Sequence, residues 1–218
     1  MDFPLAEAQA AGIDVLSGRV PVNVAGVKSV AALEIAEIDE AGEISDNTTI
    51  IGCDLVGVSG GYSPVIHLPS HLGIKPRWEA SINAFVTGKT TENIYMVGSA
   101  DGIYDHQACL DHALQVTQKI KGEKTETKPR RRIPGGMRAL FEVQITGRKL
   151  KSFIDPQHDV TSEDVRQAHR EGFVSVEHMK RYTTLGMATD QGRVGNVLGL
   201  AVMAEAQGLA VGTSGVTT

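Results

Sequence analysis

A polar stretch near the middle of the chain, residues 121–136, constrains the fold more than any other feature. Its sequence is KGEKTETKPRRRIPGG, in which charges are frequent and Pro and Gly interrupt any regular element. Such a stretch adds little to a core, so we expect it to separate two parts that each bury their own apolar residues. We expect the basic triplet Arg130-Arg131-Arg132 to be part of a solvated linker; the alternative is that it binds a partner or a phosphate.

The residues before this stretch predict a mixed α/β architecture. Residues 30–38 alternate apolar and polar side chains from Leu33 onward, and residues 48–51 follow a turn, so together they predict a β-hairpin. Two further apolar runs, at 53–58 and 92–98, each lead into a glycine turn and predict strands. We also expect short strands at 13–15 and 19–24, and an amphipathic helix over 104–120 capped by Asp101 or Asp105.

The residues after the stretch predict a small helical module. Thr161 with Asp164 three residues later resembles a capping box, and Gly172 ends the helix that follows. A second helix is expected over 174–182 with Ser175 as a candidate cap. A third, mostly buried helix is expected over 197–207 with Gly208 at its end.

Composition and charge argue against several classes of protein. The chain has 218 residues and a formal net charge of −5, which disfavours general nucleic-acid binding. Every apolar run is broken well before the roughly 18 residues that suggest a membrane span. The acidic N-terminal sequence lacks the basic region of a signal peptide, so we expect a cytoplasmic protein. The two cysteines, Cys53 and Cys109, lie far apart, which disfavours a disulfide framework or a Cys-based metal site.

Two glycine turns at predicted strand ends are candidate ligand sites. They are Gly60-Gly61 and the run from Gly98 through Ser99 and Asp101, where a missing Cβ lets the backbone approach a ligand closely. No GxGxxG follows a first strand and opens a helix, so the phosphate-cradling half of a dinucleotide fold is absent from this sequence. We therefore do not expect this half alone to bind NAD or FAD tightly.

No residue is assigned a catalytic role. No serine sits on a nucleophile elbow, which leaves no plausible Ser/His/Asp triad. His67 and His71 are four residues apart, but Pro69 between them argues against a shared helical face and favours a surface loop over a metal pair. His178 is interpreted as a satisfied core histidine, with orientation of a loop backbone as the alternative.

The most informative stretch for function is residues 176–196, VEHMKRYTTLGMATDQGRVGN. A helix-like approach leads into a loop that offers many hydrogen-bond donors and little bulk, which suits a phosphate or the polar edge of a flavin. The alternative is a helix–helix connection whose hydroxyls cap helix ends. The candidate binding residues are Lys180, Arg181, Thr183, Thr184 and Gln191.

This stretch resembles the α (large) subunit of heterotetrameric sarcosine oxidase. The family pattern is close to S-x-E-H-x-K-R-Y-T-T-x-G-M-A-T-D-Q-G-K, followed by N and a short Ala/Met/Glu helix. The upstream run SFIDPQHDVTSEDVRQAHREGF resembles the F-V-D-x-Q-x-D-V-T stretch of the same family. The runs CDLVGVSGGYSP and NIYMVGSADG resemble the closing part of its pyridine-nucleotide-disulfide-oxidoreductase-like domain. The resemblance covers nearly the whole chain and is most specific over residues 152–207.

The resemblance implies a partial FAD/NAD(P)-binding domain of that type followed by a small all-α module. Residues 1–122 would be the C-terminal part of the dinucleotide-binding-type α/β domain with a β-hairpin insertion. Residues 123–150 would be a linker or extended segment, and residues 151–212 the helical domain with the cofactor-interface loop. The family subunit also has a GxGxxG half before this region and a folate-binding domain of the aminomethyltransferase type after it, so we expect a fragment.

The resemblance also implies a share in the oxidative demethylation of sarcosine to glycine, linked to flavin and tetrahydrofolate in one-carbon metabolism. In the family the substrate and FAD sit in the β subunit, and a covalent FMN lies at the α–β interface. By position, the five candidate residues of the loop would lie on the FMN side and bind rather than catalyse. The expected partners are the β subunit and the other subunits of the heterotetramer, and the isolated fragment is expected to be inactive.

The second glycine turn departs from the wider superfamily. Most of its flavoproteins read G-D there, whereas Ser99 takes the place of that Asp and Asp101 lies two residues on. An NAD-type ligand, which the α subunit is expected to hold, is therefore favoured over a flavin at this turn. Related opine- and proline-oxidising enzymes carry a Cys cluster for an iron–sulfur centre where this chain has residues 154–160, which contain no Cys, so no such cluster is expected. The alternatives are a subunit of a related flavin-dependent amino-acid or opine dehydrogenase, and a non-catalytic subunit-interaction module.

Overall fold

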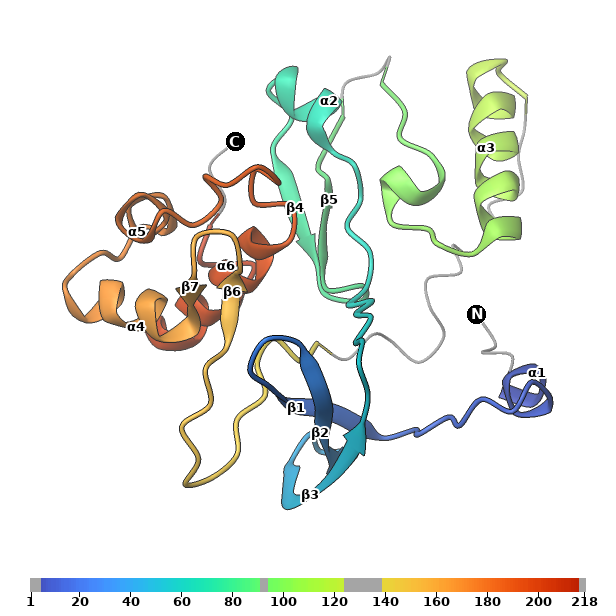
Figure 1. Cartoon of the computed structure of the whole chain (residues 1–218). Coiled ribbons are helices and arrows are strands. Elements are labelled where there is room, and N and C mark those ends of the chain that lie inside the picture. Colours follow the sequence, from blue (N-terminus) through green and yellow to red (C-terminus); the bar gives the residue numbers. More distant parts are fainter. Residues whose placement is uncertain (1–4, 91–93, 124–138, 216–218) are drawn as a thin grey trace.

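The computed structural model describes residues 5–90, 94–123 and 139–215, in which helices and strands are mixed (Figure 1). All strand pairs within these ranges are antiparallel. The elements before the central stretch are α1 (Leu5–Ala10), β1 (Arg19–Gly26), β2 (Val30–Ile38), β3 (Ile44–Gly52), α2 (His67–His71), β4 (Pro76–Glu79), β5 (Ala84–Thr87), a 3-10 turn η1 (Gly98–Asp101) and α3 (His106–Ile120). Those after it are β6 (Phe153–Asp155), β7 (Val160–Thr161), α4 (Ser162–Arg170), α5 (Val176–Thr183) and α6 (Gly195–Gln207).

The predicted β-hairpin is confirmed as the pair β2–β3, and β1 adds a third strand on the other side of β2. Leu33 lies opposite Ile51 across the hairpin. The sheet is tied to a distant part of the chain by Arg148, whose guanidinium donates two hydrogen bonds, of 2.7 and 2.9 Å, to Glu34 on β2. The Arg148 hydrogen bonds, with one from Thr48, lower the pKa of Glu34 to about 2. The segment after the central stretch therefore packs against the N-terminal sheet through a charged contact.

Three predicted strands are wrong in the part of the chain that the structure describes. Residues 13–15, 53–58 and 94–97 have no strand assignment there, and residues 92 and 93 of the last predicted strand lie outside the described ranges. Apolar composition suits a strand, but a strand also requires a hydrogen-bonded neighbour, and the described residues supply none for these segments. Leu55 and Val58 are more than 80% exposed as a result.

The sequence interpretation also misses the β4–β5 hairpin and misreads the segment before it. Trp78 and Phe85 pair across this hairpin, and their ring centroids lie 5.0 Å apart in an edge-on arrangement. Pro69 argues against a shared helical face for His67 and His71 and favours a surface loop, yet all three lie in α2, which is only five residues long. Proline is tolerated in the first turn of a helix because the first N–H groups have no partner within the helix.

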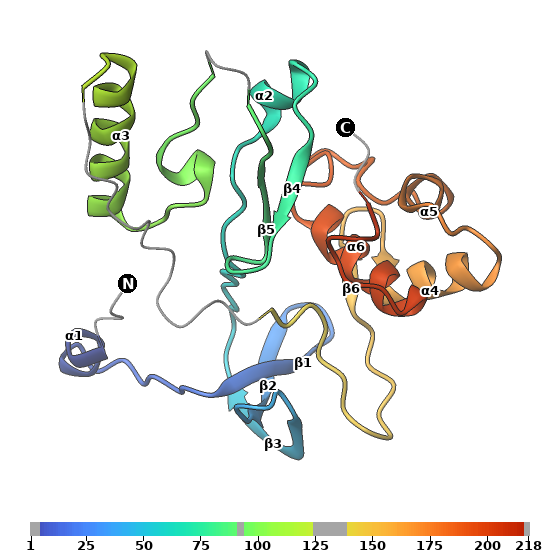
Figure 2. The ribbon, with the colours of Figure 1, turned by 180° about the vertical axis from the view of Figure 1, so that it is seen from behind.

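Helix α3 follows the sequence prediction closely. Asp105, one of the two candidate caps, accepts a hydrogen bond of 2.8 Å from the Ala108 backbone N–H. Asp101 lies instead in η1 and is buried. In both views α3 and the group α4–α6 lie on opposite sides of the β4–β5 hairpin, and the β1–β3 sheet lies beyond one end of that hairpin (Figures 1 and 2).

Helices α4, α5 and α6 pack around one apolar core, as the predicted helical module requires. The Thr161–Asp164 capping box is confirmed, and Gly208 ends α6 in the left-handed conformation. Ser175 occupies the N-cap position of α5 but makes no capping hydrogen bond with its side chain. The buried members of the core are Ile154, Val160, Val165, Ala168, Met179, Leu185, Val202 and Met203.

A half-buried charge cluster joins the segment before β6 to this helical group. The Arg166 guanidinium on α4 donates hydrogen bonds to Glu142 and, at 3.1 Å, to Glu205 on α6. The Ser162 hydroxyl donates to Glu142 as well. The side chains of Glu142 and Arg166 are only 10% and 22% exposed, so water screens this pair less than it screens a surface pair.

Acid is expected to weaken this cluster. Partial burial raises the pKa of Glu142, but hydrogen bonds from Arg166, Ser162 and Gln144 outweigh it and lower the pKa from 4.5 to about 2. Because the folded-state pKa is the lower one, the stabilisation is complete above about pH 4.5 and is lost as the pH falls toward about 2.

The free energy of unfolding in urea should therefore fall on acidification across this range. The variant Glu142→Gln should flatten the fall, leaving the part that comes from Glu34, whose pKa is also lowered to about 2. An equally steep fall in Glu142→Gln would contradict the assignment.

None of the helices within the described ranges is both long enough and apolar enough to cross a membrane.

Candidate functional site

The loop between α5 and α6, residues 184–194, carries two of the five predicted binding residues, and the other three lie at the end of α5. Its backbone turns sharply, because Thr184, Gly186, Gln191 and Gly192 all have positive φ angles. For threonine this conformation is unfavourable, since a β-branched side chain crowds the backbone there. Such strain persists only where surrounding contacts hold it, and it is typical of binding sites.

The loop is anchored to the protein interior by two side chains. Leu185 is 1% exposed and packs into the core of the helical group, against Gly199 on α6. Asn196 lies directly under the loop: a Cβ at Gly186 or Gly192 would come within 2.5 Å or 2.2 Å of its side-chain amide. The two glycines therefore let the loop lie flat on Asn196, whose Oδ1 has no hydrogen-bond partner among the described residues.

The turn between β6 and β7 holds the loop from the side. Buried Asp155 accepts hydrogen bonds from the backbone N–H groups of Gln157 and His158, and its other oxygen accepts one of 3.4 Å from Gly186. The Gln157 side-chain oxygen accepts a hydrogen bond of 3.1 Å from the Thr189 N–H. The His158 ring donates from Nδ1 to the Thr184 carbonyl at 3.2 Å, since a carbonyl oxygen can only accept. We call Asp155, Gln157 and His158 the clasp.

The five predicted binding residues, at the end of α5 and in the loop, divide into two groups. Arg181 and Thr184 are exposed, and among the described residues neither the Arg181 guanidinium nor the Thr184 hydroxyl has a partner. The other three are engaged within the protein: Lys180 pairs with Glu177 at 3.6 Å, the Thr183 hydroxyl donates to the Met179 carbonyl, and the Gln191 amide donates to the Ala188 carbonyl. The accessible donors are therefore fewer than the sequence suggests.

Two further features border the loop: the N-terminus of α6 at one end and a polar hollow beside the end of α5. Asp190 accepts hydrogen bonds from the N–H groups of Gly192 and Val194, which fixes the turn that leads into the N-terminus of α6. A hollow of about 380 Å³ adjoins the end of α5, and Asp159 and Asp164 are among its lining residues. Carboxylates accept hydrogen bonds, so this hollow suits a donor group of a ligand rather than a phosphate.

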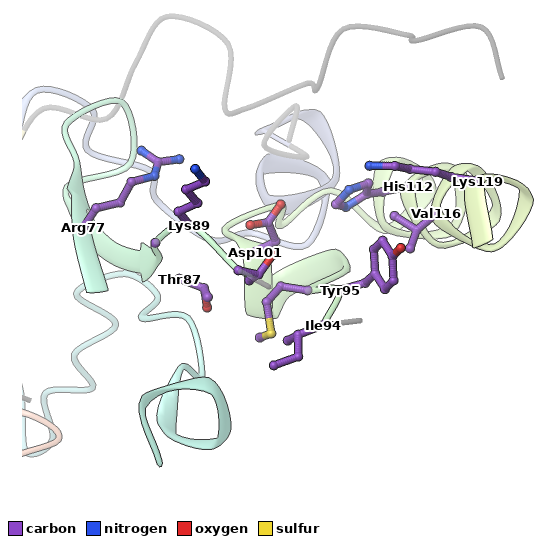
Figure 3. A pocket seen from close by; sticks show the side chains of 12 residues that line it. Arg77, Thr87, Lys89, Ile94, Tyr95, Asp101, His112, Val116 and Lys119 are labelled. Carbon is purple, nitrogen blue, oxygen red and sulfur yellow. The ribbon is translucent and has the colours of Figure 1, made fainter. Parts of the chain in front are cut away.

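The second predicted site lies at η1, beside a pocket of about 720 Å³ (Figure 3). Asp101 lies between Arg77 and Lys89 on one side and His112 and Lys119 on the other. Arg77 pairs with Glu79 at 2.7 Å, and Lys119 lies 5.8 Å from the Tyr95 ring centroid. Thr87 is 7% exposed, and within the described ranges nothing pairs with its hydroxyl, which lines the same pocket.

Hydrogen bonds connect each glycine turn to the segment that runs from η1 into α3. The Gly98 N–H donates to Nδ1 of His112 on α3 at 3.4 Å, and Ser99 is exposed at the start of η1. The Gly60-Gly61 turn is followed by Tyr62, whose carbonyl accepts a hydrogen bond of 3.2 Å from the Tyr104 hydroxyl. The structure thus brings the two glycine turns to the same part of the molecule and leaves the loop after α5 as a separate site.

Sequence reasoning missed the clasp and Asn196, and it misplaced His178. The stretch FIDPQHDVT predicts an extended segment before Pro156 and a helix cap at Thr161, but an Asp directly before Pro is also a turn signal that points to Asp155. His178 is exposed, so its interpretation as a core histidine is wrong. Within the described ranges, no group of three or more His, Cys, Asp or Glu side chains could hold a metal ion.

Comparison with solved structures defines the class of fold. The crystal structure of L-proline dehydrogenase from P. horikoshii matches 98% of this chain with a TM-score of 0.64 and 21% sequence identity. The match covers 44% of that chain. The mixed α/β arrangement described above is therefore a fold that this dehydrogenase shares.

Sequence comparison identifies the relatives. Residues 149–218 match the Sarcosine oxidase A3 domain. The chain is 34% identical over 206 residues to sarcosine oxidase subunit alpha of Rhizobium meliloti (strain 1021), and 32% identical over 222 residues to that of Corynebacterium sp. (strain P-1). These matches span 89% and 94% of the chain but only 20% and 22% of the relatives. The chain is thus related, along about nine-tenths of its length, to a fifth of the sarcosine oxidase α subunit, which confirms the predicted resemblance.

Proposed function

We propose that this chain works as part of the α subunit of a sarcosine oxidase and contributes to the oxidative demethylation of sarcosine to glycine. The observation that carries the proposal is the similarity to sarcosine oxidase α subunits along about nine-tenths of the chain. No side chain of this chain is assigned to the reacting atoms. Its share is to bind and orient cofactors and to contact companion subunits.

We infer that the loop after α5 holds FMN at an interface with the β subunit. The exposed Arg181 and Thr184 offer donors for a phosphate, and the N-terminus of α6, at the end of the loop, carries the partial positive charge of the helix dipole. Gly186 and Gly192 let the loop backbone lie flat on the Asn196 side chain, which fixes the surface that a ligand would meet. When bound, the flavin would supply the acceptor for electrons from the substrate, while this chain would hold its polar end.

A second ligand of the NAD type is proposed at η1. Asp101 is placed to accept hydrogen bonds from ribose hydroxyls, and the cations Arg77, Lys89 and Lys119 around the pocket favour an anionic nucleotide. The buried Thr87 hydroxyl, without a partner in the described part of the chain, supports a polar ligand there. The glycines at 60, 61 and 98 and Ser99 would allow close backbone approach.

The proposed partners are the other subunits of the oxidase, the β subunit among them. The relatives are themselves named as subunits, so they act within a multi-subunit enzyme. Several large apolar side chains are exposed on the segment between β3 and α2, including Leu55, Val58, Tyr62 and Val65. Large apolar side chains exposed along one segment suit a protein–protein contact. This observation also favours a second candidate function, that of a subunit-interaction module without a cofactor.

Flavin titration distinguishes the two functions. The variant Lys180→Ala/Arg181→Ala should weaken FMN binding by about tenfold or more, because a charge-assisted hydrogen bond to phosphate contributes about 1.5–3 kcal/mol. Riboflavin lacks the phosphate, so its affinity should not change. Quenching of flavin fluorescence by the 218-residue chain gives both affinities.

The matched control is Lys75→Ala/Lys121→Ala, which removes the same charge from exposed positions away from the loop. This control should bind FMN as the wild type does. A chain that binds neither flavin, or whose two double variants lose FMN affinity equally, would favour the interaction module.

A further inference from the structure

The clasp contacts the loop at three separate backbone positions. His158 reaches the Thr184 carbonyl, Asp155 the Gly186 N–H and Gln157 the Thr189 N–H. All three side chains come from one short turn, residues 155–158. Each of them contacts a backbone group of the loop and no loop side chain. The clasp therefore sets the course of the loop backbone and makes no contact with the Thr184 hydroxyl, which stays free.

The turn that carries the clasp is itself rigid. Asp155 is 5% exposed and uses one oxygen to accept hydrogen bonds from the N–H groups of Gln157 and His158, at 3.0 and 3.2 Å. Its position in β6, beside Ile154 in the apolar core, fixes the base of the turn. Because Asp155 is anchored beside the core, its hydrogen bond to Gly186 fixes the loop backbone relative to the core.

The loop needs such support because of its backbone conformation. Thr184 has a φ of 63°, a conformation that costs a β-branched residue about 1–2 kcal/mol. Gly186 and Gly192 can adopt many backbone conformations, so the loop would sample several shapes if no outside contact held it. In the structure, the hydrogen bond from His158 holds the Thr184 carbonyl and so keeps the free Thr184 hydroxyl at the surface.

We propose that Asp155, Gln157 and His158 are positioning residues for the flavin site: they hold the Thr184–Thr189 backbone in the one shape that presents the Thr184 hydroxyl to the FMN phosphate, together with Arg181 from α5. The inference rests on the proposed FMN site. It adds that the phosphate preference of this site depends on side chains that touch the loop backbone and that sequence reasoning did not single out.

The test uses Gln157→Ala in the whole chain, because Gln157 is exposed and its loss leaves no cavity. Amide hydrogen exchange over residues 184–191 should accelerate about fivefold or more, as expected when one protecting hydrogen bond is lost. Gln157→Glu keeps an acceptor oxygen for the Thr189 N–H and should restore slow exchange. This readout does not involve FMN, so it tests the clasp even if the loop binds no flavin.

Flavin affinity then tests the positioning role. In Gln157→Ala the affinity for FMN should fall about fivefold toward that for riboflavin, while the riboflavin affinity and the melting temperature stay the same. Gln107→Ala removes an exposed glutamine from α3 and should change none of these quantities. Unchanged exchange in Gln157→Ala would overturn the clasp, and faster exchange with unchanged FMN preference would overturn its positioning role. A wild-type chain that ignores FMN would overturn the proposed function and the positioning role, but not the clasp.

Discussion

Replacement of Leu185 by alanine is expected to lower the free energy of unfolding by about 3 kcal/mol, within the range known for buried Leu→Ala changes. Leu185 is 1% exposed, and it belongs both to the loop after α5 and to the core of the helical group. Its two methyl groups lie over glycines of α6: a Cβ at Gly195 would be 3.1 Å from one, and a Cβ at Gly199 2.3 Å from the other. Truncation leaves a cavity that these backbone-lined positions cannot fill.

Urea unfolding followed by circular dichroism measures this effect, and Met187→Ala is the matched control. Met187 lies two residues further along the same loop but is 50% exposed, so its truncation should change the free energy of unfolding by less than about 0.5 kcal/mol. Similar losses in the two variants would contradict the view that Leu185 anchors the loop to the core.

Removal of the Arg166 side chain is expected to have an effect of similar size. Arg166→Ala leaves Glu142, whose side chain is 10% exposed, without its charged partner, and also frees Glu205. Breaking one side of a buried ion pair costs about 3–5 kcal/mol, and the remaining exposure of this pair places the expected loss below that range, at about 2–3 kcal/mol. The segment before β6 should detach first, because Glu142 is its charged contact with α4.

The control for this variant lies one turn further along α4. Arg170 pairs with Glu163 at 2.7 Å, but both side chains are about 60% exposed, and surface pairs contribute about 0–1 kcal/mol. Arg170→Ala should therefore unfold at nearly the wild-type urea concentration. If the two arginine variants unfold at the same urea concentration, the cluster around Glu142 stabilises the fold no more than a surface ion pair does.

Local sequence signals predicted much of the secondary structure. The capping box at Thr161, the Asp105 cap of α3 and the glycine at the end of α6 act over a few residues, and each is present as predicted. The β2–β3 hairpin also depends on neighbours in sequence, an alternating strand and a nearby turn. Such elements could be read from the chain because the contacts that stabilise them lie close together in it.

The errors concern contacts between residues far apart in the chain. Residues 53–58 have the composition of a strand but no partner in the described part of the structure, and sequence alone does not say whether a partner exists. The Glu34–Arg148 contact joins positions 114 residues apart. Periodicity carries no information about such pairings, and so the arrangement of the segments could not be predicted.

The sequence predicted where the candidate site lies, but it did not predict which of its side chains are free to contact a ligand. The residue types at 180–191 marked a loop rich in donors, and the structure places Arg181 and Thr184 at its surface with free donor groups. It also shows Thr183 and Gln191 engaged with carbonyls of their own loop and helix. Whether a hydroxyl faces a ligand or its own backbone depends on the turn geometry, which composition does not specify.

The central claim, that the loop after α5 receives FMN, is tested most directly by nuclear magnetic resonance of the chain labelled with ¹⁵N. Addition of FMN should shift the amide signals of residues 180–191 and of Gln157 and His158, and these shifts should saturate with one dissociation constant. Shifts confined to Gly98–Asp101, or no shifts at concentrations well above those of a weak complex, would contradict the claim.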